Sequence, residues 1–214
     1  MIGVKDVRKF SLMTTLLALV ACKAEKVEIS LDSAMILAAA DGHVGTVSFE
    51  AAVGEQYATV DDEKRALIES VTSLIEKYFP DADVDVDIGT DEYEIEVEGN
   101  LSVSSASPTT GAPWHVSATQ ATDGEGVVVR LLPSAPFVSF LAELQEVNMM
   151  LGADEYQPVE FSFTAPSGTV LVGGAIVDGM PIGVARVPMN GQTIKMLFKD
   201  GIWEKTAGTF VYIP

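Results

Sequence analysis

The residues from Asp83 to Glu98, DVDVDIGTDEYEIEVE, alternate acidic and apolar side chains on both sides of a short turn. Successive side chains of a strand point to opposite faces, so this period of two predicts two strands that are each acidic on one face and apolar on the other. Gly89 to Asp91 separates the two runs, as expected for the turn of a hairpin. The stretch therefore predicts an antiparallel hairpin that is buried on one face.

The acidic face of this hairpin is dense, with nine acids and no base between Asp81 and Glu98. Like charges opposite one another across strands are destabilising, so solvent, counterions, a bound cation or a basic partner must offset them. Oxygen ligands suit Ca²⁺. The candidate residues for binding a cation or a partner are Asp83, Asp85, Asp87, Asp91 and Glu94.

These five residues occupy positions 1, 3, 5, 9 and 12 of a calcium-loop pattern, but Ile88 stands at the sixth position, where the pattern needs glycine. The valines between the aspartates also favour a strand over a ligand loop. Three interpretations stay open: a solvated charged face, a specific cation site, and a docking surface for a basic protein.

The segments before the hairpin predict two more strands and two helices. Apolar alternation favours strands over Val27–Leu31 and Gly45–Val53, and Ser33–Ala40 is typical of a short apolar helix. From Asp62 to Phe79, apolar residues recur every three or four positions until Pro80, which indicates an amphipathic helix.

The segments after the hairpin follow a Ser/Thr/Pro-rich linker candidate at Ser102–Gly111. Alternation and apolar spacing predict strands over Pro113–Thr119, Gly126–Leu132 and Val159–Thr164, and a helix over Pro136–Leu151. Beyond Gly168, short apolar runs are separated by Asp178-Gly179, Asn190-Gly191 and Asp200-Gly201, which are strong signals for tight hairpins.

These elements together predict an α+β fold, in which an antiparallel sheet carries two main helices packed on it and ends in a C-terminal β-meander. The folded domain spans residues 27–214. Two related halves, 27–103 and 112–214, are an alternative, because Val27–Ala52 and Val127–Ala165 both predict a strand, a helix and a similar second strand, although this order is common by chance.

The first 22 residues differ from the rest of the chain. Met1–Lys9 carries three basic residues and one acid, and Phe10–Ala21 is apolar up to the single cysteine, Cys22. A basic start followed by a short apolar centre is typical of an export signal. A buried helix of a cytosolic protein is the alternative, whereas the apolar run is too short to span a hydrocarbon core of about 30 Å.

Leu19-Val20-Ala21-Cys22 resembles the lipobox of bacterial lipoproteins. The resemblance implies that residues 1–21 are a signal peptide cut before Cys22, and that Cys22 is lipidated, with diacylglycerol and palmitate-type acyl chains. Residues 22–26 would then be a short tether that holds the domain at a membrane of the bacterial cell envelope. Lys23 after the cysteine resembles the pattern sorted to the outer membrane, facing the periplasm.

Charge and composition exclude several classes of function. The chain has 13 basic and 31 acidic residues, for a net charge of −18, which disfavours binding to nucleic acid. The two histidines, His43 and His115, lie far apart in the sequence, and no serine-nucleophile motif accompanies them. The sequence therefore predicts a protein that is not an enzyme and that has no cofactor, no catalytic residues and no assured metal site.

We expect the chain to be a membrane-anchored envelope lipoprotein that binds or scaffolds another envelope component, such as a basic protein, through its acidic surface. One alternative is a lipoprotein that binds a small molecule or a cation such as Ca²⁺. Another is a lipoprotein encoded by a phage or prophage that blocks an outer-membrane receptor.

Overall fold

The computed structural model describes residues 26–56, 59–90, 92–122, 124–149, 151–153, 157–199 and 208–214. Within these ranges the chain forms three helices, α1 (Ser33–Ala40), α2 (Asp62–Tyr78) and α3 (Phe137–Val147). The strands are β1 (Lys26–Asp32), β2 (Gly45–Gln56), β3 (Asp83–Ile88), β4 (Glu92–Ser104), β5 (Trp114–Gln120), β6 (Val127–Pro133), β7 (Val159–Thr164), β8 (Thr169–Val177), β9 (Met180–Pro188), β10 (Thr193–Phe198) and β11 (Thr209–Ile213). No helix in these ranges is long and apolar enough to cross a membrane.

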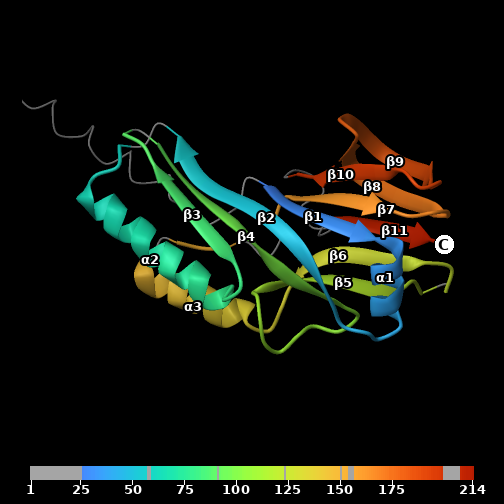
Figure 1. Cartoon of the computed structure of the whole chain (residues 1–214), viewed down its shortest axis with the longest axis horizontal. Coiled ribbons are helices and arrows are strands. Elements are labelled where there is room, and N and C mark those ends of the chain that lie inside the picture. Colours follow the sequence, from blue (N-terminus) through green and yellow to red (C-terminus); the bar gives the residue numbers. More distant parts are fainter. Residues whose placement is uncertain are drawn as a thin grey trace, which may run out of the picture.

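The strands close into a barrel because the two ends of the sheet pair with each other. Nine strands follow one another around it in the order β10-β7-β1-β2-β4-β5-β6-β11-β8, and β8 pairs again with β10. Neighbours are antiparallel except in the pairs β1–β7 and β4–β5, which are parallel. β3 extends the sheet beside β4, and β9 extends it beside β8, so both lie outside the ring (Figure 1).

The predicted α+β fold, a sheet with two main helices packed on it, is therefore wrong. The molecule is mostly a closed nine-stranded barrel with three short helices. The alternation of apolar and polar residues predicts the single strands correctly. It does not distinguish an open sheet from a barrel, because each strand of a barrel also has one inward and one outward face. Closure depends on the pairs β1–β7 and β8–β10, and local patterns do not encode such long-range pairings.

The predicted C-terminal β-meander is also wrong. β8 and β9 do form a hairpin, and its turn residues Asp178 and Gly179 have φ angles of 45° and 83°, as a two-residue type I′ turn requires. The next strands pair elsewhere: β10 with β7 and β8, and β11 with β6 and β8. The turn at Asn190-Gly191 thus leads away from β9, and Asp200-Gly201 lies outside the described residues.

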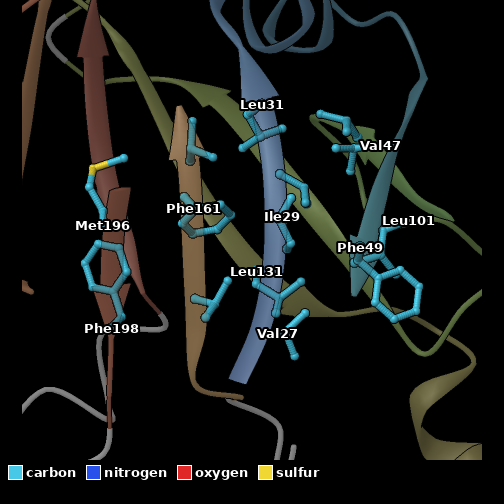
Figure 2. Close-up of a cluster of buried hydrophobic side chains, with 14 of the residues drawn as sticks. Val27, Ile29, Leu31, Val47, Phe49, Leu101, Leu131, Phe161, Met196 and Phe198 are labelled. Carbon is cyan, nitrogen blue, oxygen red and sulfur yellow. The ribbon is translucent and has the colours of Figure 1, made fainter. Parts of the chain in front are cut away.

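Aromatic rings form a continuous part of the barrel core. Ring centroids lie 5.4 Å apart in the pair Phe161–Phe210 and 5.2 Å apart in the pairs Phe163–Phe210 and Phe163–Tyr212. The Tyr212 hydroxyl donates a hydrogen bond of 2.9 Å to the carbonyl of Ser167, so the one polar group of this stack is satisfied. Figure 2 shows a part of the core with labelled side chains from β1, β2, β4, β6, β7 and β10.

The helices lie at opposite ends of the molecule (Figure 1). α1 follows β1 directly at one end of the barrel, and the Asp32 side chain caps it by accepting a 2.8 Å hydrogen bond from the Met35 amide. α2 and α3 lie side by side at the other end, where β2, β3 and β4 project beyond the barrel. Asp61 caps α2 by accepting a 2.8 Å bond from the Lys64 amide.

One polar cluster joins α2 to α3. The Lys77 ammonium pairs with the Glu143 carboxylate, and the Tyr78 hydroxyl donates a 2.9 Å hydrogen bond to the same carboxylate. The hydrogen bonds from Lys77 and Tyr78 lower the pKa of Glu143, and the bond to Glu143 raises the pKa of Lys77. Below this cluster the rings of Tyr78 and Phe140 meet edge to face, with centroids 5.3 Å apart. The two helices therefore act as one packed unit.

Candidate functional site: an acidic face on the barrel and its projecting hairpin

The structure confirms the hairpin predicted from the alternating acids. β3 pairs antiparallel with β4, in a register that places Asp83 opposite Glu98, Asp85 opposite Glu96, and Asp87 opposite Glu94. All six carboxylates are exposed on one face of the hairpin. Among the remaining predicted site residues, Asp91, Leu19, Val20, Ala21 and Cys22 lie outside the described residues.

The acids of the hairpin continue across the barrel in a row that the sequence alone did not predict. Glu98 of β4 lies opposite Glu50 of β2, Glu50 opposite Glu28 of β1, and Glu28 opposite Glu160 of β7. With Asp83 of β3, one carboxylate from each of five neighbouring strands lies in this row. The sequence shows the alternation within β1 and β2. It does not show the register in which these strands pair with β4 and β7, which lie far away along the chain.

We call this surface the acidic face. It consists of the outward-pointing acids of β3, β4, β2, β1 and β7, namely Asp83, Asp85, Asp87, Glu94, Glu96, Glu98, Glu50, Glu28 and Glu160. Side chains directly opposite each other in a sheet lie about 5 Å apart, and two unit charges at that distance in water repel by somewhat less than about 1 kcal/mol. Solvent makes the exposed acids of β2, β3 and β4 tolerable, whereas Glu160, whose side chain is 13% exposed, lies beside two lysines.

Basic residues neutralise only one end of the row. The Lys26 ammonium lies 2.6 Å from a Glu28 carboxylate oxygen and 3.7 Å from one of Glu160, and Lys195 lies 3.5 Å from Glu160. The hydrogen bond to Glu28, together with the charge of Glu160, raises the pKa of Lys26. Within the described part of the chain, no ion pair involves the acids of the row on β2, β3 and β4. The unneutralised charge is thus concentrated toward the hairpin.

A shallow groove of about 240 Å³ runs over the acidic face between β1, β2 and β4. Glu28, Glu50, Glu96 and Glu98 line it together with one basic residue, Lys26, which is paired with Glu28, and with the small side chain of Ala52. Such a groove suits an extended basic segment, whose side chains can reach carboxylates on three strands.

The described residues contain no group of three or more His, Cys, Asp or Glu side chains that could hold a metal ion together. Asp83, Asp85 and Asp87 alternate along one straight strand, which separates successive carboxylates on a face by about 6.5 Å. A calcium loop instead folds its ligands around the ion. Of the predicted cation set, Asp83, Asp85 and Asp87 follow one another along β3, and Glu94 lies opposite Asp87 on β4.

The free edge of β3 is protected against pairing with another strand. The Asp85 carboxylate accepts a 3.0 Å hydrogen bond from the Val86 amide, so a side chain occupies a donor of the strand. Exposed charges along an edge strand also resist edge-to-edge association. A partner is therefore expected on the acidic face and not on the edge of β3.

The opposite face of the same strands is apolar. Alternate residues of β2 and β4, such as Phe49, Ala51 and Val97, point toward α2 and α3. Between these strands, β1 and the helices lies a cavity of about 80 Å³, which we call the apolar cavity. Trp114 and Phe140 contribute to its wall, and their ring centroids are 5.8 Å apart.

The two histidines show no catalytic arrangement. His43 is exposed in the turn after α1, whereas His115 on β5 is only 2% exposed. Burial lowers the pKa of His115, and in the described structure its Nδ1 atom has no hydrogen-bond partner. Neither histidine lines the groove on the acidic face.

A scan against protein-family models and a search of curated protein sequences found no match to this chain.

Proposed function

We propose that this protein is a lipid-anchored lipoprotein of the bacterial envelope, not an enzyme, that binds a basic envelope component through the acidic face. The observation that carries the proposal is the row of carboxylates across five strands, of which only the β1–β7 end is paired with lysines. A lysine- or arginine-rich segment placed in the groove would relieve the repulsion within the row and gain attraction at the same time.

The position of the proposed anchor supports a partner at the membrane surface. Lys26 begins β1 and belongs to the same face as Glu28, and only three residues separate it from Cys22. The four peptide units from the Cα atom of Cys22 to that of Lys26 span at most about 14 Å when they are fully extended. A lipid on Cys22 would thus keep the groove close to the bilayer, within reach of basic segments of envelope proteins, with the outer membrane as the favoured location.

The lipid anchor is tested by metabolic labelling with a fatty-acid analogue. We expect the wild-type chain to be labelled and to sediment with membranes, and the Cys22→Ala variant to lose the label because it lacks the thiol. A wild-type chain that carries no label would contradict the anchor, whatever the result for the acidic face.

The acidic face is tested by capturing partners of the tagged full-length protein from solubilised envelopes at about 50 mM and about 300 mM salt, where screening differs strongly. The test variant is Glu50→Gln/Glu96→Gln/Glu98→Gln, which removes three charges that line the groove. The matched control, Glu69→Gln/Glu76→Gln/Glu146→Gln, removes three exposed charges from α2 and α3. Both variants have the same net charge, so they differ only in where the charges were lost.

We expect wild type and control to capture the same basic protein at low salt, and the groove variant to lose it. High salt should weaken the capture in both proteins that retain the groove, because the contact is electrostatic. Equal capture by both variants, or no specific partner at either salt concentration, would contradict the proposal.

A further inference from the structure

Two strands lie outside the ring, β3 beside β4 and β9 beside β8, at opposite ends of the molecule (Figure 1). Within the described residues, each of them pairs with one strand only. The other edge of each strand therefore presents unpaired backbone N–H and C=O groups, to which a further strand can be added. Acids protect the edge of β3 against such pairing, whereas β9 has no acid.

The charge around β9 differs from that of the rest of the chain. No acidic residue stands between Asp178 and Asp200, although the chain has 31 acids, and the only charge on β9 is the exposed Arg186. Pro181 and Pro188 have no N–H group, so they limit backbone pairing to the stretch between them. The edge of β9 that can accept a further strand is therefore residues 182–187.

The side chains of this edge are apolar and exposed. Met180 is 64% exposed and Val184 is 87% exposed, and among the described strands only β9 carries exposed large apolar side chains. Val184 is uncovered because its cross-strand neighbour on β8 is Gly173, which has no side chain. An exposed apolar edge strand without acids is a site of strand association.

A shallow groove adds to this apolar surface. It has a volume of about 320 Å³ and lies beside the turn of the β8–β9 hairpin, where Ile176, Pro181, Ile182 and Leu197 line it. Lys199 is the only charged residue of its lining. Apolar surface therefore extends from β9 onto the neighbouring strands, and a partner on β9 would cover more than the strand edge alone.

The charge of the molecule indicates which partner this edge suits. Each copy has a net charge of −18, and the acidic face lies on other strands, so two copies repel each other least when they approach through β9. An antiparallel edge is also self-complementary about a twofold axis. With the axis at Val184, each Arg186 lies opposite the partner's Ile182, so the two arginines do not face each other.

We propose that β9 is the contact surface of a homodimer, in which the β9 strands of two copies lie antiparallel around Val184 and continue the sheet from one copy into the other. One strand per copy makes a small interface, so the dimer is weak, with a dissociation constant on the order of 10 µM. The contact uses neither the acidic face nor the lipid anchor, so it is independent of the proposed function.

The first test is sedimentation equilibrium of the purified full-length protein in a density-matched detergent, at about 50 mM and about 300 mM salt. We expect the mass to rise from one copy toward two with increasing concentration. The higher salt concentration should strengthen association at least about threefold, because it screens the repulsion between two acidic copies. This dependence on salt is opposite to the one expected for capture of a basic protein by the acidic face.

Val184→Glu and Val138→Glu are a matched pair of variants for this test. Both place one negative charge at an exposed valine, the first on β9 and the second on α3, so they differ only in position. Val184→Glu should weaken association at least about tenfold, because it brings two carboxylates together at the twofold axis. Val138→Glu should associate as wild type does.

The second test is disulfide crosslinking in isolated membranes. Residues paired across antiparallel strands have Cα atoms about 4.5–5.5 Å apart, which a disulfide can bridge. We therefore expect Val184→Cys to give a dimer band on a non-reducing gel after mild oxidation. Wild type and Val138→Cys should give none, and these two controls account for Cys22 and for random collision. This test also decides the matter should Val184→Glu fail to fold.

Four results would overturn the proposal. Wild type stays a single copy at every concentration up to about 100 µM, well above the expected dissociation constant; or Val184→Glu associates as strongly as Val138→Glu; or salt weakens the association; or Val184→Cys forms a disulfide only with a different protein, which would assign β9 to another partner.

Discussion

Ala51 and Ala52 are adjacent in β2, yet they line opposite environments. Ala51 is paired with Val27 and Val97 and faces the apolar cavity, whereas Ala52 is paired with Lys26 and Glu96 and faces the acidic groove. The same strands, with the same backbone hydrogen bonds, carry a dry face and a charged face. One sheet therefore separates two chemically opposite surfaces, and a shift of the register by a single residue would exchange them.

The two faces tolerate change very differently. Water screens the carboxylates of the acidic face, so each of them contributes little to stability, favourable or unfavourable. The side chains of the apolar face are mostly buried, so a charge placed there would lose its hydration, and the loss of a ring would leave a cavity. Four predictions test this asymmetry.

The largest effect is expected where a carboxylate is moved to the wrong face. Val97 is only 4% exposed and lies between Glu96 and Glu98. Val97→Asp places an unpaired charge in the apolar face and should lower the free energy of unfolding by about 3–5 kcal/mol, measured by urea denaturation. Glu96→Gln, one residue away, should change it by less than about 0.5 kcal/mol. Similar losses in the two variants would contradict the comparison.

A large effect is also expected from removing a ring of the apolar face. Phe140 is 4% exposed and packs edge to face against Tyr78. Phe140→Ala enlarges the space beside the apolar cavity and should destabilise the protein by about 3–4 kcal/mol in the same assay. Val138 lies on the same helix and is 73% exposed, so Val138→Ala should cost less than about 0.5 kcal/mol. A loss from Phe140→Ala no larger than that of the control would show that α3 does not seal this face.

A small gain in stability is expected from removing a charge in the middle of the row. Glu98 lies between Asp83 and Glu50, so Glu98→Gln removes two like-charge neighbours and should stabilise the protein by about 0.5 kcal/mol at low salt. The gain should shrink at about 0.5 M salt because exposed charges are screened. The control, Glu69→Gln on α2, should show no such gain. A loss of stability in Glu98→Gln would mean that the row is not repulsive.

The smallest effect concerns the exposed cluster between α2 and α3. Glu143 has a pKa below its ordinary value of 4.5, so its contribution to stability is present above that pH and is lost as the pH falls through the lowered pKa. Lys77 has a pKa above 10.5, so its contribution is present below that pH and is lost as the pH rises through the raised pKa.

We therefore expect the melting temperature of wild type to exceed that of Glu143→Gln at every pH between the lowered pKa of Glu143 and the raised pKa of Lys77. This difference in melting temperature should fade at both acidic and alkaline extremes, whereas the control Glu69→Gln, on α2, should follow wild type. A difference that persists unchanged at acidic pH would contradict the ion pair as its cause.

The sequence alone was sufficient for properties that depend on neighbours along the chain. The alternation from Asp83 to Glu98 predicted the hairpin and its acidic face, and the apolar spacing after Asp61 predicted α2, which ends at Tyr78. Both patterns are local, because the side-chain direction of a strand or helix follows from its own backbone period. The leader and its lipobox are likewise local patterns, and the anchor that they imply stays a prediction.

Only the tertiary structure decided how these elements meet. The closed barrel depends on the parallel pairing of β1 with β7 and on the second partner of β8. The same register lines up Glu28, Glu50 and Glu160 with the hairpin, which no local pattern indicates. The apolar cavity likewise exists because α3, far along the chain, packs its Phe140 against β-strand residues. Alternation determines which face each side chain takes, and long-range register determines which side chains it meets there.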